Sequence, residues 1–289
     1  MDYQNCALCP RQCGVDRTAG EKGFCLCPDI ALVAKTMLHK WEEPVLAGNG
    51  GSGAIFFGGC TLGCSYCQNR AISAGPVGTP TDSRGLRRIM EDLISRGAEN
   101  IDLVTPTQFL PTLIPALREP LPVPVVYNCG GYERAETVRS LEGLVDIWLP
   151  DLKYADDPLA QRLSGAKDYF ACAAAAIRQM VKQTGAPVWQ GEKLQSGVVI
   201  RHLILPGQVE NSLKVLDWIG ENFEPGQVLV SLMRQYTPMP GLSAPLDRRI
   251  TGEEYQSVLS WMYLNGLQGF TQEEEAASGA YIPDFESKK

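Results

Sequence analysis

Apolar residues in this chain fall into short continuous runs from residue 54 onward. The runs contain few alternating polar positions, which is typical of strands in a parallel sheet that is covered on both faces. Turn-forming residues bound most of them. The pattern predicts strands at residues 54–58, 101–105, 124–128, 145–150, 198–205 and 228–233.

The segments between these runs repeat their apolar residues at helical spacing. They predict helices at residues 82–96, 108–118, 134–141, 156–163, 169–184, 211–222 and 252–264. Six strand–helix units indicate an α/β protein, built either as a parallel barrel or as an open doubly wound sheet. A chain of 289 residues is long enough to bury one core of that size.

The two ends of the chain do not follow this alternation. Residues 1–45 form a cysteine-rich segment, in which residues 31–39 are predicted to be a short helix, and residues 269–289 form a tail. The tail contains Glu273, Glu274 and Glu275, a run that we expect to be solvated. Three parts are therefore expected: 1–45, 46–268 and 269–289.

Two features near the first predicted strand are expected to have little functional role. The glycine-rich residues 48–53 precede a strand instead of a helix, so they lack the helix start that makes a phosphate loop. His39 is expected to be a partly buried surface histidine.

Composition and charge narrow the range of functions. The net charge of −7 argues against a general role in binding nucleic acid or a membrane surface. The basic residues Arg84, Arg87 and Arg88 are expected on a solvated helix face. No apolar run approaches bilayer-spanning length, and the polar N-terminus does not resemble a signal peptide. We therefore expect a cytoplasmic protein.

Ten cysteines suggest metal chemistry, and eight of them precede residue 68. In a reducing compartment, clustered cysteines more often bind metal than form disulfides. Cys60, Cys64 and Cys67 are spaced C-x3-C-x2-C, which is one thiolate short of a closed zinc site. Three thiolates suit a cubane iron–sulfur cluster with one open iron. Cys129 and Cys172 are expected to be ordinary thiols.

A second group of cysteines lies at the N-terminus. Cys6, Cys9, Cys13 and Cys25 supply enough thiolates to close a site, either a structural zinc or a second iron–sulfur cluster. Ligand count alone does not separate these two readings. Cys27 is expected to be a spare thiol or a replacement for Cys25.

Polar residues gather where the predicted strands end, which is where α/β folds place their chemistry. Asp151 and Lys153 are two residues apart, so on a strand they share a face and suit a zwitterionic or hydroxyl-bearing ligand. Asn128 occupies a similar strand end. Arg201 and His202 are adjacent, so at most one of them faces the barrel interior.

The cysteine loop, with Tyr66 before its third cysteine, resembles the signature of the radical S-adenosylmethionine (SAM) superfamily. The resemblance extends along most of the chain. Within the superfamily, the chain resembles the branch labelled pyruvate formate-lyase activating enzyme-like. The stretches that carry it are CALCPRQCGVDR at 6–17, KWEEP at 40–44, YN at 127–128, LPDLKY at 149–154 and QYTP at 235–238.

The resemblance implies a partial (β/α)6 TIM-type barrel and a [4Fe–4S] cluster on Cys60, Cys64 and Cys67. It also implies that the amino and carboxylate groups of SAM chelate the fourth iron. Tyr66 would lie near the adenine, and the pair Asp151 and Lys153 is similar to a D-x-K element that contacts SAM.

Where many relatives carry Gly-Gly-Glu to hold the methionine amino group, this chain reads Thr105-Pro106-Thr107. Thr105 is the candidate replacement. The complete set of candidate SAM-binding residues is Tyr66, Thr105, Asn128, Asp151, Lys153, Arg201 and His202.

The expected activity is that of a radical SAM oxidoreductase. Reductive cleavage of SAM would give methionine and a 5′-deoxyadenosyl radical that abstracts hydrogen from a glycyl residue of a partner enzyme, a small molecule or a peptide. Flavodoxin or ferredoxin is the implied electron donor. The alternative is a non-catalytic iron–sulfur or zinc protein that transfers electrons or acts as a scaffold, which does not account for Asp151 and Lys153.

Overall fold

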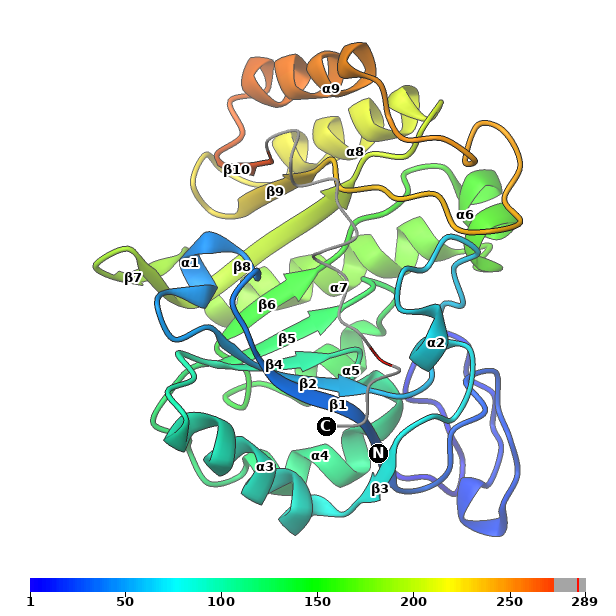
Figure 1. Cartoon of the computed structure of the whole chain (residues 1–289), viewed down its shortest axis with the longest axis vertical. Helices are drawn as coiled ribbons and strands as arrows, with labels where there is room; N and C mark the ends of the chain where they lie inside the picture. Colours follow the sequence, from blue (N-terminus) through cyan, green and yellow to red (C-terminus); the bar gives the residue numbers. More distant parts are fainter. Residues whose placement is uncertain (273–284, 286–289) are drawn as a thin grey trace.

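A parallel sheet forms the centre of the protein (Figure 1). The computed structural model describes residues 1–272 and 285. All six predicted strands are confirmed, and a short further strand extends the sheet beyond them. In spatial order, the parallel strands are β2 (Ser52–Phe57), β4 (Ile101–Val104), β5 (Val125–Cys129), β6 (Ile147–Pro150), β8 (Lys193–Leu203), β9 (Leu229–Met233) and β10 (Gly269–Thr271).

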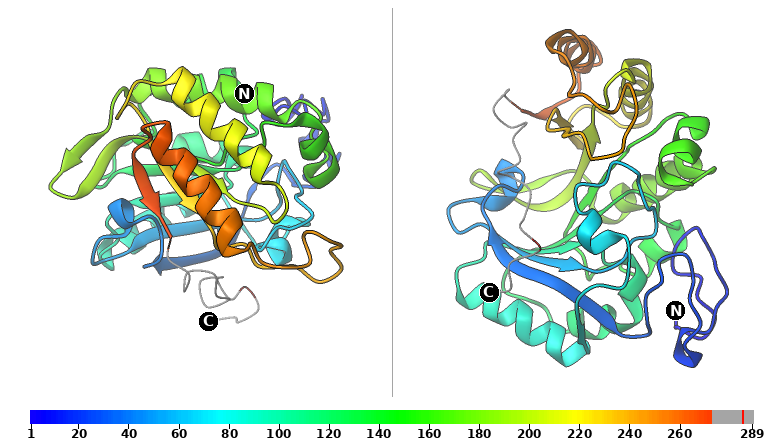
Figure 2. Two further views of the ribbon diagram at one scale, coloured as in Figure 1. Left: turned by 90° about the horizontal axis from the view of Figure 1, so that it is seen from above. Right: turned by 45° about the vertical axis from the view of Figure 1, so that its right-hand side comes forward.

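The seven helices predicted between and after these strands are also confirmed, and two of them have the predicted bounds. Figures 1 and 2 show the longer helices along the outer side of the curved sheet, as in a partial TIM-type barrel. The helical elements are η1 (Arg17–Ala19), α1 (Pro44–Ala47), α2 (Arg70–Ser73), α3 (Ser83–Ser95), η2 (Thr107–Phe109), α4 (Leu110–Leu117), α5 (Ala135–Arg139), α6 (Asp157–Ser164), α7 (Tyr169–Thr184), α8 (Val209–Asn222) and α9 (Gly252–Leu264).

The predicted helix at residues 31–39 is wrong, because this segment is strand β1 (Ala31–His39). It pairs antiparallel with β2 from Val33 opposite Phe57 to His39 opposite Ser52, and its other edge pairs with β3 (Thr79–Thr81). The open edge of β2 therefore outweighs the local helical preference of the segment. Residues 31–39 of the cysteine-rich segment therefore pair with the strands of the sheet.

Smaller predictions concern His39, the basic residues of α3 and the C-terminal tail. His39 is partly buried, as expected, and Arg84 and Arg88 are exposed on α3. The tail begins with β10, which was not predicted, and Glu273, Glu274 and Glu275 lie outside the described residues. The hairpin strand β7 (Val188–Gln190) pairs with the start of β8. No described helix combines the length and apolar character needed to cross a membrane.

The inner and outer faces of the sheet are packed differently. The outer face packs against the helices in one large apolar cluster. The inner face is apolar only near the amino ends of the strands, where Val126, Leu149 and Val199 pack with Val45 and Leu46 of α1. The inward polar residues begin with Asp102, which is level with Val126, and continue toward the carboxyl ends with Asn128, Asp151, Arg201 and Ser231. This change in polarity marks the interior of the barrel as the place for chemistry.

Candidate active site

The cysteine loop leaves the end of β2 through two glycines that no other residue could replace without rearrangement. A Cβ on Gly58 would lie 1.8 Å from the carbonyl oxygen of Val77, and one on Gly59 would lie 2.3 Å from Cys27 Sγ. Gly59 also has a φ of +73°, which favours glycine. Close packing against residues 27 and 77 therefore fixes the path of the loop.

Each of the three loop thiols accepts a hydrogen bond. The Leu62 N–H lies 3.4 Å from Cys60 Sγ, the Ser164 hydroxyl 3.0 Å from Cys64 Sγ, and the Ser73 hydroxyl 3.3 Å from Cys67 Sγ.

Burial, with a contribution from the neighbouring Cys64, raises the pKa of Cys60 to about 12, and burial also raises the pKa of Cys64. Thiols of this kind deprotonate on metal binding. Hydrogen bonds to sulfur are among the features that tune the potential of iron–sulfur clusters. The donor set therefore fits a [4Fe–4S] cluster, although no three described ligand side chains converge on the position of a single metal ion.

A cavity of about 210 Å³ lies beside these thiols. Cys60, Cys64 and Cys67 form one part of its wall. The other part comes from residues at or just beyond the ends of the parallel strands. Six of the seven predicted SAM-binding residues line the cavity: Tyr66, Thr105, Asn128, Asp151, Lys153 and Arg201.

Asp151 is the centre of a charge network inside this cavity. Its carboxylate accepts from Arg201 Nε at 2.9 Å and from Lys153 Nζ, and Arg201 Nη2 donates to Asn128 Oδ1 at 2.5 Å. Burial alone would raise the pKa of Asp151, but Arg201 and Lys153 hold it below its ordinary value. Burial opposes the charge of Lys153 as well, yet Asp151 and Cys64 raise the pKa of the lysine. The network thus keeps fixed charges of both signs beside the thiols.

Tyr66 and Thr105 are held by specific hydrogen bonds. The Tyr66 hydroxyl lies 2.8 Å from that of Tyr154, which lies 2.7 Å from the Ser164 hydroxyl that reaches Cys64. Thr105 has a φ of +59°, an uncommon conformation for a β-branched residue. Its N–H donates to the Asn128 carbonyl at 2.8 Å, and its carbonyl accepts from Gln108 Nε2 at 2.8 Å.

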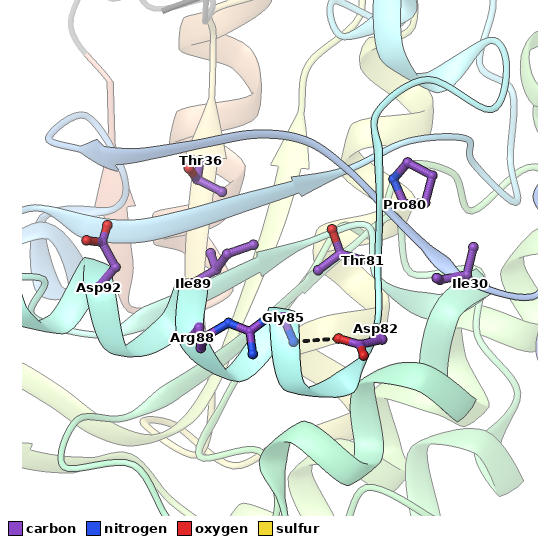
Figure 3. Close-up of a pocket in the computed structure, with 9 residues that line it drawn as sticks. All are labelled: Ile30, Thr36, Pro80, Thr81, Asp82, Gly85, Arg88, Ile89 and Asp92. Atoms are coloured by element: carbon purple, nitrogen blue, oxygen red, sulfur yellow. Dashed lines mark hydrogen bonds between the residues drawn. The ribbon is translucent and has the colours of Figure 1, made fainter.

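A larger cavity, of about 590 Å³, shares no lining residue with the cysteine cavity. Figure 3 shows the side chains that line it. It is a surface hollow between α3 and strands β1 and β3, lined in part by Asp82, Arg88 and Asp92. The Asp82 carboxylate there caps α3 by accepting from the Gly85 N–H at 2.7 Å. Its charged residues thus include a helix cap, and none of the cysteines lines it.

Comparison with known proteins agrees with this site. A family model described as a 4Fe-4S single cluster domain matches residues 46–112, which include the three loop cysteines. An uncharacterized protein of Methanocaldococcus jannaschii is 29% identical over 270 residues, which cover 89% of this chain and 74% of the relative.

Three solved structures share the architecture. A radical SAM methyltransferase from Sphaerobacter thermophilus matches with a TM-score of 0.53 and 14% identity, over 76% of this chain and 66% of the other. SuiB of Streptococcus suis, in a structure with bound SAM, matches with a TM-score of 0.53 and 13% identity, over 77% of this chain and 50% of the other. A spore photoproduct lyase mutant matches with a TM-score of 0.53 and 10% identity, over 83% and 80%.

The chain has the radical SAM fold. It spans about half the length of SuiB and about two thirds of the methyltransferase. At these identities the likeness defines the architecture, and the activity has to be argued from the residues of the site.

Within the radical SAM fold, His202 lies on the outer face of its strand, away from the cavity. Its ring nitrogens lie 2.6 Å from the Leu152 carbonyl oxygen and 2.8 Å from the Ser212 hydroxyl. Burial lowers the pKa of His202 to about 4, so the ring is neutral near pH 7. His202 therefore holds strand β8 against α8, and Arg201 is the member of the pair that faces inward.

Four residues that the sequence did not identify also serve the site. Ser73 and Ser164 donate to the thiols, Tyr154 links Tyr66 to Ser164, and Gln108 binds the carbonyls of Gly58, Gly59 and Thr105. Their signal is weak, because none belongs to a spaced motif. Only Tyr154, in LPDLKY, lies in a segment that carries the resemblance to the radical SAM superfamily.

The N-terminal thiols Cys6, Cys9, Cys13 and Cys25 line one small cavity of about 20 Å³. Cys27 does not line this cavity but lies beside Cys25, with its thiol 3.2 Å from the Cys25 carbonyl oxygen and 3.5 Å from that of Gly58. The Cys27 side chain lowers the pKa of Cys25 to about 6, whereas burial raises the pKa of Cys9. The structure thus groups the four predicted thiols in one cavity, with Cys27 next to Cys25.

Two arginines join this N-terminal group to the cysteine loop. Arg11 donates to the carbonyls of Thr61 and Leu62 at 3.1 and 3.2 Å, and to that of Ser164 at 3.0 Å. Arg17 is 2% exposed and donates to the Gln108 carbonyl at 2.7 Å. The N-terminal segment therefore buttresses the loop that carries the other three thiols.

Proposed function

We propose that this protein is a radical SAM enzyme. The observation that carries the proposal is a single cavity that joins Cys60, Cys64 and Cys67 to the buried charges of Asp151, Lys153 and Arg201. Three thiolates leave an iron of a cubane cluster open, and the charges lie where a zwitterionic ligand of that iron would extend. A protein that only carried electrons would not need this cavity.

In the proposal, the three thiolates hold a [4Fe–4S] cluster and the polar wall binds SAM. When bound, the reduced cluster supplies the electron that splits SAM into methionine and a 5′-deoxyadenosyl radical. Lys153 and Arg201 remain charged at neutral pH and can receive a carboxylate, while Asp151 can receive an ammonium group. Tyr66, Thr105 and Asn128 supply further contacts.

The cavity walls also limit where a primary radical could react. Tyr66 and Asn128 are each 5% exposed, and Leu62 is 2% exposed. A site built from such residues excludes water and holds one C–H bond near the reacting carbon.

We propose further that the chain belongs with the activating enzyme-like branch. The motif at 149–154 and the cysteine loop support this reading, and a flavodoxin- or ferredoxin-type protein in the cytoplasm would donate the electron. The target would be a glycyl residue of a partner enzyme, or a small molecule or peptide. Production of a glycyl radical signal in a candidate partner, measured by electron paramagnetic resonance (EPR), separates the protein target from the others.

The first experiment is anaerobic reconstitution with iron and sulfide. The expected result is about four irons at the loop site, together with an EPR signal of the reduced cluster that changes when SAM is added. A reconstituted cluster whose EPR signal is identical with and without SAM would contradict the proposal. Zinc alone on the loop cysteines would favour the alternative of a structural or scaffold protein.

We also propose that Cys6, Cys9, Cys13 and Cys25 hold a second metal group. Their shared cavity supports this, and its identity as zinc or a second cluster is decided by metal and sulfide analysis. The variant Cys60→Ala/Cys64→Ala/Cys67→Ala should retain the metal of the N-terminal group, and Cys6→Ala/Cys9→Ala/Cys13→Ala should lose it. Loss of all metal from the loop variant would show that the two groups are not independent.

A further inference from the structure

A second cavity adjoins the cysteine cavity inside the barrel. It has a volume of about 460 Å³ and shares two lining residues, Arg201 and Met233, with the smaller one. Residues 40–48, between β1 and β2, form one side of it, and β9 and β10 contribute to the other. In Figure 1, α1 lies beside β8, and β9 and β10 lie above it in that view. A ligand there would reach the contents of the cysteine cavity.

Two glutamates lie in the buried part of this second cavity. Glu42 and Glu43 line it, with a 10% exposed side chain and a 9% exposed residue, respectively. Glu42 lies 3.5 Å from Arg201 Nη1. Within residues 1–272, Glu43 forms no ion pair, and its hydrogen-bond partner is Ser231. Burial, then the charge of Glu42, raises the pKa of Glu43 to about 7.

Asp102 adds a third carboxyl between the two cavities. It is 0% exposed, and its Oδ2 accepts from Asn128 of the cysteine cavity at 3.3 Å. The same carboxyl is hydrogen-bonded to Glu42 of the second cavity. Burial, then the charge of Glu42, raises the pKa of Asp102 well above its usual range, so this carboxyl favours its protonated form. Asp102 therefore links the two cavities through hydrogen bonds and adds little negative charge to either.

Two buried cations lie beside three other carboxyls in this region, those of Glu42, Glu43 and Asp151. Arg201 is shared between Asp151 and Glu42, and Lys153 is bonded to Asp151. Lys40 also lines the second cavity, but it is exposed at the surface. A buried site with more carboxyls than cations binds a positive charge in preference to a neutral or negative group.

We propose that the second cavity binds the substrate, and that it does so through an ammonium or guanidinium group received by Glu42 and Glu43. The substrate class is a small organic cation with a carbon chain, comparable in size to a basic amino acid. Apolar side chains of Met233 and Phe270 line the same cavity and suit methylene groups. The cation end would be held at the carboxylates while the chain extends past Met233 toward the cysteine cavity.

This inference rests on the proposed function, since it assigns the substrate of that site. It also favours one branch of the proposal. The backbone glycine of a partner protein is neutral and carries no group for Glu42 and Glu43 to receive. A small cationic molecule satisfies both carboxylates.

The test is binding to the full-length, cluster-loaded protein by isothermal titration calorimetry. The probes are lysine, arginine, agmatine and 1,5-diaminopentane, with 1-pentanol and 1,5-pentanediol as uncharged analogues of matched chain length. At least one cation should bind ten-fold or more tightly than the neutral analogues. Glu43→Gln and Glu42→Gln should each weaken that binding about ten-fold, because a hydrogen bond to a charged group contributes at least 1.5 kcal/mol.

Glu91→Gln is the matched control, since Glu91 is exposed on α3 and pairs with Arg87. It should bind the cation as wild type does. The inference is overturned if no cation in the panel binds, if neutral analogues bind equally well, or if both cavity variants bind cations like wild type. None of these outcomes depends on SAM cleavage, so a failure of the proposed function remains separately visible in the cluster and its EPR signal.

Discussion

Asp151 is flanked by two cations inside the barrel, and this makes Asp151→Asn an informative substitution. The carboxylate receives Arg201 Nε at 2.9 Å and also Lys153 Nζ, and its side chain is only 15% exposed. Asparagine keeps the shape but removes the negative charge, which leaves the two cations facing each other. Breaking a buried pair from one side costs about 3–5 kcal/mol, since the remaining charge has no equivalent partner.

We therefore expect the free energy of unfolding of Asp151→Asn to fall by about 3–5 kcal/mol. The assay is urea denaturation of the metal-free protein at pH 7, followed by tryptophan fluorescence. Asp92→Asn is the control, because Asp92 pairs with Arg96 on the exposed face of α3 and its side chain is 63% exposed. The control should show only a small loss. A loss for Asp151→Asn as small as that of the control would refute the view that this network is held in a poorly solvated interior.

Three further predictions concern the loop, the thiols and the outer face of the sheet. Gly58→Ala should cost about 3 kcal/mol in urea denaturation, because the added Cβ would meet a backbone carbonyl at 1.8 Å, whereas Gly75→Ala meets nothing within 4 Å and should be tolerated. An equal effect of the two changes would contradict this. Ser164→Ala should keep the iron content but shift the reduction potential of the cluster to a more negative value, because Cys64 loses its hydrogen bond. Redox titration followed by EPR measures the potential, and an unchanged potential would contradict this prediction. His202 has an ordinary pKa of 6.5 that the fold lowers to about 4, so its contribution to stability is complete above pH 6.5 and about 3 kcal/mol of it is lost as the pH falls to 4. His202→Gln should flatten the pH dependence of urea denaturation in that window, and an unaltered slope would refute the assignment.

The sequence predicted the alternation of strands and helices because most of these segments carry their own signal. Apolar runs and helical repeats are local, so helices such as α7 and α9 were found with their observed bounds. Strand β1 was missed because its conformation depends on the edge of β2, which the sequence of β1 does not encode. Strand β10 was missed for a similar reason, since it is only three residues long and pairs with β9.

The same distinction between local signals and long-range contacts applies to the candidate site. Spaced cysteines and the pair Asp151 and Lys153 are visible in the sequence, and one cavity brings them together. Ser164 reaches Cys64 from 100 residues away, so only the folded chain reveals the contact. Strand alternation placed Arg201 and His202 on opposite faces, but it did not say which residue faces inward. The structure decides that point through the contacts of Arg201 with Asp151 and Asn128.

We propose that the cysteine loop and the polar wall cleave SAM together. The most direct measurement is chromatographic quantification of 5′-deoxyadenosine after the reconstituted protein is incubated anaerobically with SAM and dithionite. We expect 5′-deoxyadenosine and methionine in equal amounts from wild type. The Cys64→Ala variant should yield no 5′-deoxyadenosine above the reagent background. A protein that carries a complete [4Fe–4S] cluster on Cys60, Cys64 and Cys67 and yields no 5′-deoxyadenosine would contradict it.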